Sequence, residues 1–234
     1  MKGVLAMLFM PFDELFLVLV LPAILFSMWA QYKVTSSFGH YSKQRTRGGL
    51  TGANAAREVL KRAGVSGVRI ERISGNLTDH FDPSTNVIRL SDSVHDAASV
   101  AAVGVAAHEA GHAIQYASSY APMRFRAAII PVTNIGSKLS VPLILAGLIL
   151  GFTGLINLGI LLFGAVVLFQ LVTLPVEYNA SSRAMKTIEQ NAILEATEMP
   201  GARKVLNAAA LTYVAALIVS LLQILRFLAI ARRR

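Results

Sequence analysis

The sequence contains no cysteine among its 234 residues. Disulfide bonds, iron–sulfur clusters, cysteine nucleophiles and zinc sites built on thiolates are therefore excluded. Any metal ion that the chain binds must be held by imidazole nitrogens and carboxylate oxygens, and the chain has five histidines to offer.

Charged residues are also scarce, at 15% of the chain against about 25% in soluble domains. Hydrophobic residues make up 54%, and the mean hydropathy is +0.56. We therefore expect a membrane protein in contact with the lipid bilayer. The net charge of +9 is carried beside apolar segments, where it fits contact with anionic lipid. No nucleic-acid motif accompanies it, so nucleic acid is not an expected partner.

The apolar runs predict about four transmembrane helices. An N-terminal anchor is expected at 1–30, where Asp13 and Glu14 interrupt the apolar run and argue against a cleaved signal peptide. A transmembrane hairpin is expected at 127–174, with a break near 151–154. A last span with a basic tail is expected at 205–234.

Two polar segments, 31–126 and 175–204, separate these runs. The second is predicted to be helical, and the first to form a small α+β domain. Its predicted elements are a helix at 55–63, strands at 68–73 and 86–90, and a helix from 94 to about 116. The two strands are expected to pair as a short β-hairpin, and Ser91 or Ser93 to cap the longer helix.

The longer helix carries the sequence HEAGH at 108–112. Residues four apart share one face of a helix, so His108 and His112 can direct imidazole nitrogens at one metal ion. Glu109 lies beside them, where it can take a proton from a water molecule that the ion activates. One Zn²⁺ per chain is the expected cofactor, because imidazole and carboxylate ligands with an open position match catalytic zinc sites. The alternative, two ordinary hydrogen-bonded histidines, needs buried polar partners on an otherwise apolar helix.

The third ligand lies outside this motif, because the residues after His112 do not continue with the glycine and histidine of metzincins. The candidates are His40, His80, His95, Glu177, Glu189, Glu195 and Glu198. Glu177 is favoured because Pro175 predicts a helix that begins there and leaves the membrane. The alternative is a carboxylate that caps this helix. Glu177 can meet His108 only if the chain crosses the membrane an even number of times between them.

Four blocks of sequence resemble the YugP-like membrane zinc metallopeptidases of bacteria, in the same order and over nearly the whole chain. They are LTDHFDP at 77–83, VAAHEAGHAIQ at 105–115, LVTLPVEYNAS at 171–181 and VLNAAALTYVA at 205–215. The resemblance implies a neutral zinc peptidase embedded in the bacterial cell membrane. The family is similar to the HtpX-like gluzincins, in which an E-x-x-x-D helix completes the zinc site. This similarity implies a zincin domain of gluzincin type, with Glu177 as third ligand. Ser181 stands at the aspartate position, and Asn179 or Ser181 can replace the aspartate in orienting a zinc ligand.

The resemblance also suggests where a substrate binds. In gluzincin folds, an edge strand before the zinc helix pairs with an extended substrate. The residues that this implies are Asn86, Val87, Ile88 and Arg89. His80 is a candidate catalytic residue that binds substrate or stabilises the developing oxyanion; the alternative is a turn histidine bonded to its own loop. Arg183 and Tyr178 are weaker oxyanion candidates.

The predicted function is that of a zinc metalloendopeptidase, with Glu109 as general base. It would cleave unstructured or membrane-associated polypeptides. One alternative, a site-2-type intramembrane protease, needs an aspartate ligand from a later span, and 139–174 contains none. Another is a metal-binding or chaperone-like protein without turnover, which would not need Glu109. Seven basic residues follow the first span and one lysine precedes it, which predicts a cytoplasmic catalytic domain, although the arginines at 232–234 then lie outside.

Overall fold

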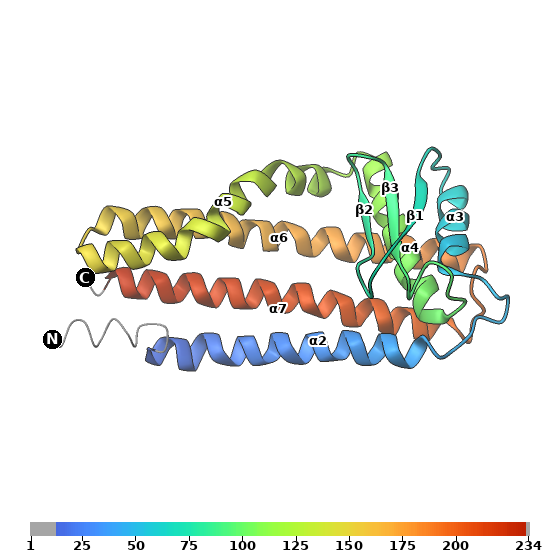
Figure 1. Cartoon of the computed structure of the whole chain (residues 1–234), viewed down its shortest axis with the longest axis horizontal. Helices are drawn as coiled ribbons and strands as arrows, with labels where there is room; N and C mark the ends of the chain where they lie inside the picture. Colours follow the sequence, from blue (N-terminus) through green and yellow to red (C-terminus); the bar gives the residue numbers. More distant parts are fainter. Residues whose placement is uncertain (1–12, 233–234) are drawn as a thin grey trace. The chain divides into compact units, whose positions relative to one another are not determined.

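The computed structural model of the chain describes residues 13–232. Its elements are η2, a π-helix (Phe16–Val20), α2 (Leu21–Tyr41), α3 (Gly52–Arg62), β1 (Arg69–Ile73), β2 (His80–Asp82), β3 (Val87–Ser91), α4 (Val100–Ala117), α5 (Ala121–Leu150), α6 (Thr153–Gln190) and α7 (Met199–Arg232) (Figure 1). These residues divide into two compact units. The helical unit comprises 13–30, 125–174 and 212–232, and the mixed unit comprises 31–124 and 175–211.

Four helices among the described residues are long and apolar enough to cross a membrane. They are Phe16–Tyr41, Ala121–Leu150, Thr153–Gln190 and Met199–Arg232. The predicted fold class, a mainly helical membrane protein with about four spans and a small α+β part, is confirmed. The parts of the predicted anchor and tail at 1–12 and 233–234 lie outside the described residues.

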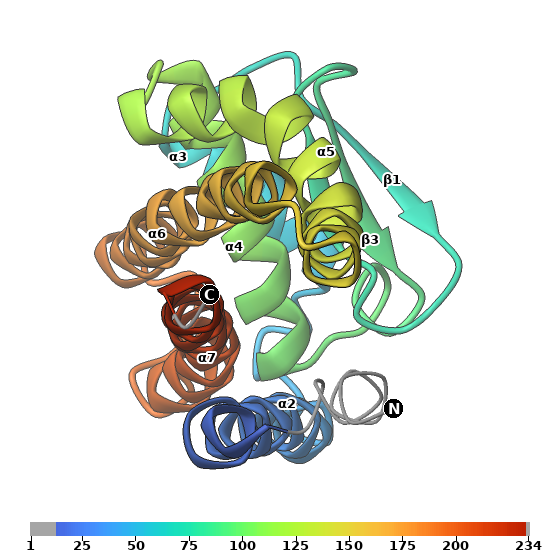
Figure 2. The same cartoon turned by 90° about the vertical axis from the view of Figure 1, so that its left-hand side faces the viewer.

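Within the helical unit, α5 and the first part of α6 run side by side in opposite directions (Figures 1 and 2). Gly151 makes the turn between them with a φ of +67°, which glycine adopts without strain. One turn earlier, a Cβ on Gly147 would lie 2.8 Å from the backbone nitrogen of Ile156. The two helices therefore approach each other through a residue without a side chain, just before the break that the sequence predicts at 151–154.

The predicted helix start at Pro175 is wrong, because α6 runs unbroken through that residue. A proline inside a helix removes one backbone hydrogen bond and costs about 3 kcal/mol. Burial of the residues that follow offsets this cost, since Val176 and Ala180 are fully buried. Pro131 and Pro142 likewise lie inside α5, as proline often does in membrane helices.

The mixed unit contains a three-stranded sheet in the order β1-β3-β2. β1 pairs in parallel with β3, and β2 pairs antiparallel with β3. The predicted hairpin between the strands at 68–73 and 86–90 is therefore wrong, and the hairpin joins β2 to β3 instead. Alternating polar and apolar residues indicate a strand but do not identify its partner, and β2 lies in the turn-rich stretch between the two predicted strands.

Because β3 is the central strand, the prediction that 86–90 forms an edge strand is also wrong. Its backbone groups pair with β1 on one side and with β2 on the other, so an extended substrate cannot be added there. Val87 and Ile88 are fully buried, and Arg89 forms an ion pair with Asp82 at 2.9 Å. Asn86 holds the turn, with a φ of 55°. The contacts of Asn86, Val87, Ile88 and Arg89 thus lie within the sheet and its turn, and they stabilise the fold.

α4 begins at Val100. The start that the sequence predicts, at 94, is therefore wrong. Ser99 caps the helix by accepting a hydrogen bond from the backbone N–H of Ala102 at 3.2 Å. Ser91 and Ser93, the predicted caps, instead bond to side chains of the preceding loop. The helix that carries HEAGH is therefore shorter than predicted and is confined to the mixed unit.

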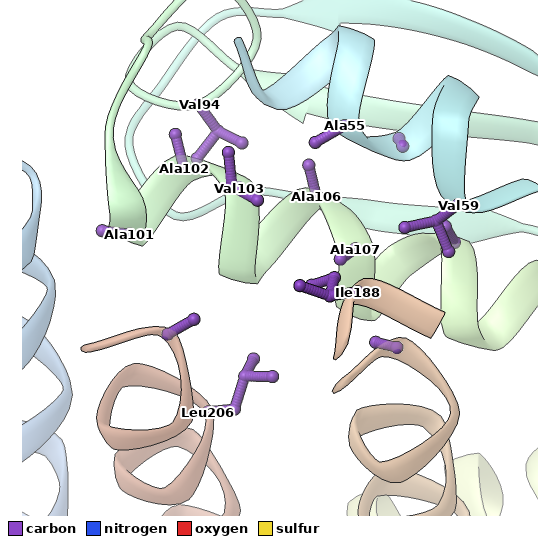
Figure 3. Close-up of a cluster of buried hydrophobic side chains, with 14 of the residues drawn as sticks. Ala55, Val59, Val94, Ala101, Ala102, Val103, Ala106, Ala107, Ile188 and Leu206 are labelled. Atoms are coloured by element: carbon purple, nitrogen blue, oxygen red, sulfur yellow. The ribbon is translucent and has the colours of Figure 1, made fainter. Parts of the chain in front are cut away.

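Small side chains let α4 pack closely on its neighbours within the mixed unit. Figure 3 shows Ala55 and Val59 of α3, Ile188 of α6 and Leu206 of α7 around the alanine and valine side chains of α4. All of these residues are buried, and each buried methylene contributes about 0.8 kcal/mol. α4 is thereby fixed on several sides as the scaffold for its polar residues.

Candidate metal centre

Three polar side chains from two helices converge in the mixed unit. α4 provides His108 and His112, and α6 provides Glu177. The Nε2 atom of His108 lies 3.2 Å from Glu177 Oε2, and the Nε2 atom of His112 lies 3.3 Å from the same oxygen. The two rings meet edge to face with their centroids 4.7 Å apart. The ligand atoms of the three residues all lie within 4.8 Å of one another, close enough to share one ion.

Gly111 explains how α6 comes so close to α4. A Cβ on this residue would overlap the carbonyl oxygen of Ala180 and lie 3.0 Å from its carbonyl carbon. Ala180 follows Glu177 on α6 by less than one turn. A side chain at position 111 would therefore push Glu177 away from the histidines, and the glycine of HEAGH sets the spacing between the two halves of the site.

The site is almost closed to solvent. The side chains of His108 and His112 are 14% and 12% exposed, and that of Glu177 is 3% exposed. Burial disfavours a charged imidazole, but the hydrogen bond and charge of Glu177, together with Glu109 and Gln115, outweigh it and raise the pKa of His112. The surroundings of His112 thus stabilise positive charge, as a metal cation requires.

The second nitrogen of each histidine is held by a polar side chain. His108 Nδ1 lies 3.0 Å from the hydroxyl oxygen of Ser181, and His112 Nδ1 lies 3.0 Å from Gln115 Oε1. The structure therefore places Ser181 where the resemblance implies an orienting aspartate. Gln115 was not predicted to have a role, although its position three residues after His112 in the same helix is the signal that could have revealed it.

The residues present fit a zinc ion. Two imidazole nitrogens and one carboxylate oxygen form the donor set of catalytic zinc sites, which leave a fourth position open. Both histidines bind an outward partner through Nδ1 and face Glu177 through Nε2, which is the orientation found in zinc ligands with a hydrogen-bonded outer shell. His108, His112 and Glu177 could therefore hold the ion.

Glu109 adjoins this cluster on α4. It is 7% exposed, and within residues 13–232 its carboxylate makes no hydrogen bond or ion pair. Most buried carboxylates are paired or hydrogen-bonded, because an unpaired buried charge is costly. A carboxylate of this kind next to a metal-binding group is suited to taking part in proton transfer.

The other residues singled out from the sequence lie elsewhere. His80 is exposed in β2, and its Nδ1 lies 2.9 Å from the carbonyl oxygen of Thr78. This contact matches the alternative of a turn histidine bonded to its own loop, and a role in catalysis stays a prediction. Of the other third-ligand candidates, three meet an ionisable side chain: His95 meets Asp96, Glu189 meets Arg203 and Glu195 meets Arg47. Glu198 accepts the backbone N–H of Arg47, and His40 packs on Tyr41.

Comparisons with known proteins agree with this site. A family model described as "Putative neutral zinc metallopeptidase" matches residues 16–232. A protein of Bacillus subtilis (strain 168), "Putative membrane protease YugP", is 49% identical over 216 residues, which cover 92% of this chain and 96% of the relative. No solved structure matches significantly. The resemblance seen in the sequence is confirmed. The chain therefore belongs to this family of neutral zinc metallopeptidases.

Proposed function

We propose that the protein is a zinc-dependent metalloendopeptidase of the membrane. One observation carries the proposal: the Nε2 atoms of His108 and His112 converge on Glu177 Oε2, and the carboxylate of Glu109 adjoins them. Membership of a zinc metallopeptidase family and a relative named as a membrane protease support it. A purely metal-storing site would not need a buried, available carboxylate beside its ligands.

The proposed reaction is hydrolysis of a peptide bond by water. When bound, zinc lowers the pKa of a water molecule to about 7 and polarises the scissile carbonyl. Glu109 is the general base: its carboxylate accepts a proton from the attacking water. It then donates this proton to the leaving amine nitrogen as the C–N bond breaks. General acid–base catalysis of this kind contributes about 10²–10⁴-fold to the rate.

The proposed substrates are unstructured or membrane-associated polypeptides. Glu177 follows the apolar run that ends at Leu174 by three residues on the same continuous helix, which supports a site near the bilayer. The ligands are almost fully buried, and a folded protein would have to unfold locally to bring a peptide bond to them. β3 offers no free edge, so we do not assign substrate pairing to it.

The proposed orientation places the site in the cytoplasm, on the basis of the basic residues after the first span. The α5–α6 hairpin supports one part of this topology, since two crossings return the chain to its starting side. Digestion of intact spheroplasts by an added protease tests the orientation. Protection of the 31–124 segment agrees with it, and cleavage there without lysis contradicts it.

The function is tested with Glu109→Gln in the full-length protein in detergent. We expect the variant to bind as much zinc as the wild type and to lose at least about 10²-fold of its casein hydrolysis. Glu189→Gln is the matched control, because Glu189 is an exposed residue of α6 that pairs with Arg203. Retained hydrolysis by a zinc-loaded Glu109→Gln variant would contradict the role of Glu109. A wild type that binds zinc but cleaves no polypeptide would favour the non-catalytic alternative.

A further inference from the structure

A chain of polar side chains runs away from the metal centre behind His112. His112 Nδ1 meets Gln115 Oε1 at 3.0 Å, and Gln115 Nε2 lies 3.0 Å from Asn179 Oδ1. Arg183 Nε then lies 2.7 Å from the same Asn179 oxygen. The chain thus links a candidate metal ligand on α4 to a guanidinium group on α6, six residues after Glu177. We call the residues Gln115, Asn179 and Arg183 the relay.

The guanidinium group of Arg183 determines which groups of the relay donate hydrogen bonds and which accept them. Arginine has only donors, so the atom of Asn179 that faces Arg183 must be the carbonyl oxygen. This oxygen also faces Gln115, which must therefore present its NH₂ group to Asn179. The backbone carbonyl of Val176 imposes the same orientation, because it accepts the second hydrogen of Gln115 Nε2 at 2.7 Å. A flip of Gln115 would place two acceptors against each other, and a flip of Asn179 would place two donors against each other.

The order of donors and acceptors in the relay also determines which nitrogen of His112 carries a hydrogen. With its NH₂ group committed, fully buried Gln115 can offer only its carbonyl oxygen to the imidazole. His112 must then carry a hydrogen on Nδ1, so the neutral imidazole that binds a metal has its lone pair on Nε2, the atom that faces Glu177. We propose that Gln115, Asn179 and Arg183 are positioning residues that fix the tautomer and ring orientation of His112 for metal binding. This inference rests on the proposed function.

The two histidines differ in this respect. His108 Nδ1 meets the hydroxyl group of Ser181, and a hydroxyl can donate as well as accept. Ser181 therefore holds the ring of His108 without dictating which nitrogen carries the hydrogen. The tautomer of His112 is fixed, because the relay prevents Gln115 from exchanging its carbonyl oxygen for its NH₂ group.

The surroundings of Arg183 agree with a positioning role rather than the oxyanion role that the sequence suggested. Its NH1 group lies 3.3 Å from the hydroxyl oxygen of Ser118, and its guanidinium lies 5.5 Å from the ring centroid of Tyr120. Both residues follow α4 directly in sequence. Arg183 is thus held by the end of α4 and by Asn179, which keeps its Nε donor aimed into the relay.

Zinc affinity of the full-length protein in detergent, measured by competition with a chromogenic chelator, tests the relay. The visible absorption spectrum of the Co²⁺-loaded protein provides a second readout, because it reports ligand geometry independently of activity. We expect Gln115→Met to weaken zinc binding about 10–100-fold and to alter the Co²⁺ spectrum. Asn179→Leu, which removes the shared acceptor, should weaken it less. Asn179→Asp keeps an acceptor for both neighbours and should bind zinc like the wild type.

Arg183→Leu should lower zinc affinity, whereas Arg203→Leu, the control, should not. Arg203 is an exposed arginine that pairs with Glu189 outside the relay. Equal zinc affinity and Co²⁺ spectra in Gln115→Met and the wild type would overturn the proposal. If Asn179→Asp lowered zinc affinity as much as Asn179→Leu, the claim that Asn179 acts as the shared hydrogen-bond acceptor would be wrong. Absence of zinc binding by the wild type would be a different result, since it would refute the proposed function itself.

Discussion

Buried polar side chains have different partners in the mixed unit and in the helical unit. In the mixed unit, the buried side chains of Gln115 and Glu177 each bond to a histidine of the metal centre. Among the described residues, the two buried hydroxyls without a hydrogen-bond partner, Ser140 and Thr173, both belong to the helical unit. The comparison indicates that polar contacts in the mixed unit orient ligands, whereas the helical unit depends mainly on close apolar packing.

One ion pair departs from that pattern in the helical unit. Arg226 of α7 pairs with Asp13 at 2.8 Å and is almost fully buried, and its guanidinium lies 5.3 Å from the ring centroid of Phe16. Asp13 also accepts the backbone N–H of Phe16 at 2.8 Å. The acid that interrupts the first apolar run in the sequence therefore joins the beginning of the first span to the last helix.

The largest effect is expected from breaking this pair. Arg226→Met leaves the partly buried Asp13 carboxylate without its partner, and loss of one member of a buried pair costs about 3–5 kcal/mol. Unfolding in a denaturing detergent should show this loss, and the double variant with Asp13→Asn should recover part of it. Zinc affinity of the folded fraction should not change, because the pair belongs to the helical unit. A loss of zinc affinity without a loss of stability would contradict the separation of roles between the units.

The next largest effect is expected at Gly111. In Gly111→Ala, the new methyl group overlaps the Ala180 carbonyl and displaces Glu177, and a displacement of about 1 Å can lower the rate about 10²-fold. Casein hydrolysis and zinc affinity should therefore both fall. Gly104→Ala on the same helix is the control, because its Cβ would meet Ala202 at 3.5 Å, an ordinary contact. Equal behaviour of the two variants would contradict the spacing role of Gly111.

The smallest effect is expected from one substitution made in each unit. Ser181→Ala removes the partner of His108 Nδ1 and should weaken zinc binding by about 10-fold. Ser140→Ala removes a hydroxyl that has no partner, so it should leave zinc binding unchanged and the unfolding midpoint unchanged or slightly higher. Destabilisation by Ser140→Ala together with full zinc affinity in Ser181→Ala would reverse the contrast between the units.

The site was more predictable from the sequence than the sheet. The four-residue spacing of His108 and His112 is a local property of one helix, and it survives the misplaced start of α4 because both residues lie well inside the helix. Glu177 lies far away in sequence, and the residues alone left several candidates open. It was singled out by its place after the hairpin and by the resemblance of the block around it.

The strand partners could not be predicted, because pairing depends on long-range contacts that an alternating pattern does not encode. The strand at 86–90 was correctly expected to exist, but β2, only three residues long, enters the sheet beside it and takes its edge. The helix start predicted at Pro175 is wrong for a similar reason, because the burial of Val176 and Ala180 stabilises α6 across the proline. The spacing of Gln115 from His112 shows that the two side chains can meet, but not which other groups surround the glutamine.

The most direct test of the account is the zinc content of Glu177→Ala compared with the wild type, measured on full-length protein after dialysis against a weak chelator. The account predicts about one zinc ion per wild-type chain and almost none in the variant, because two histidines alone hold the ion weakly. Glu189→Ala, a control on the same helix, should retain its zinc. A Glu177→Ala variant that keeps the full amount of zinc would contradict the assignment of the third ligand, and with it the claim that α4 and α6 together build the metal centre.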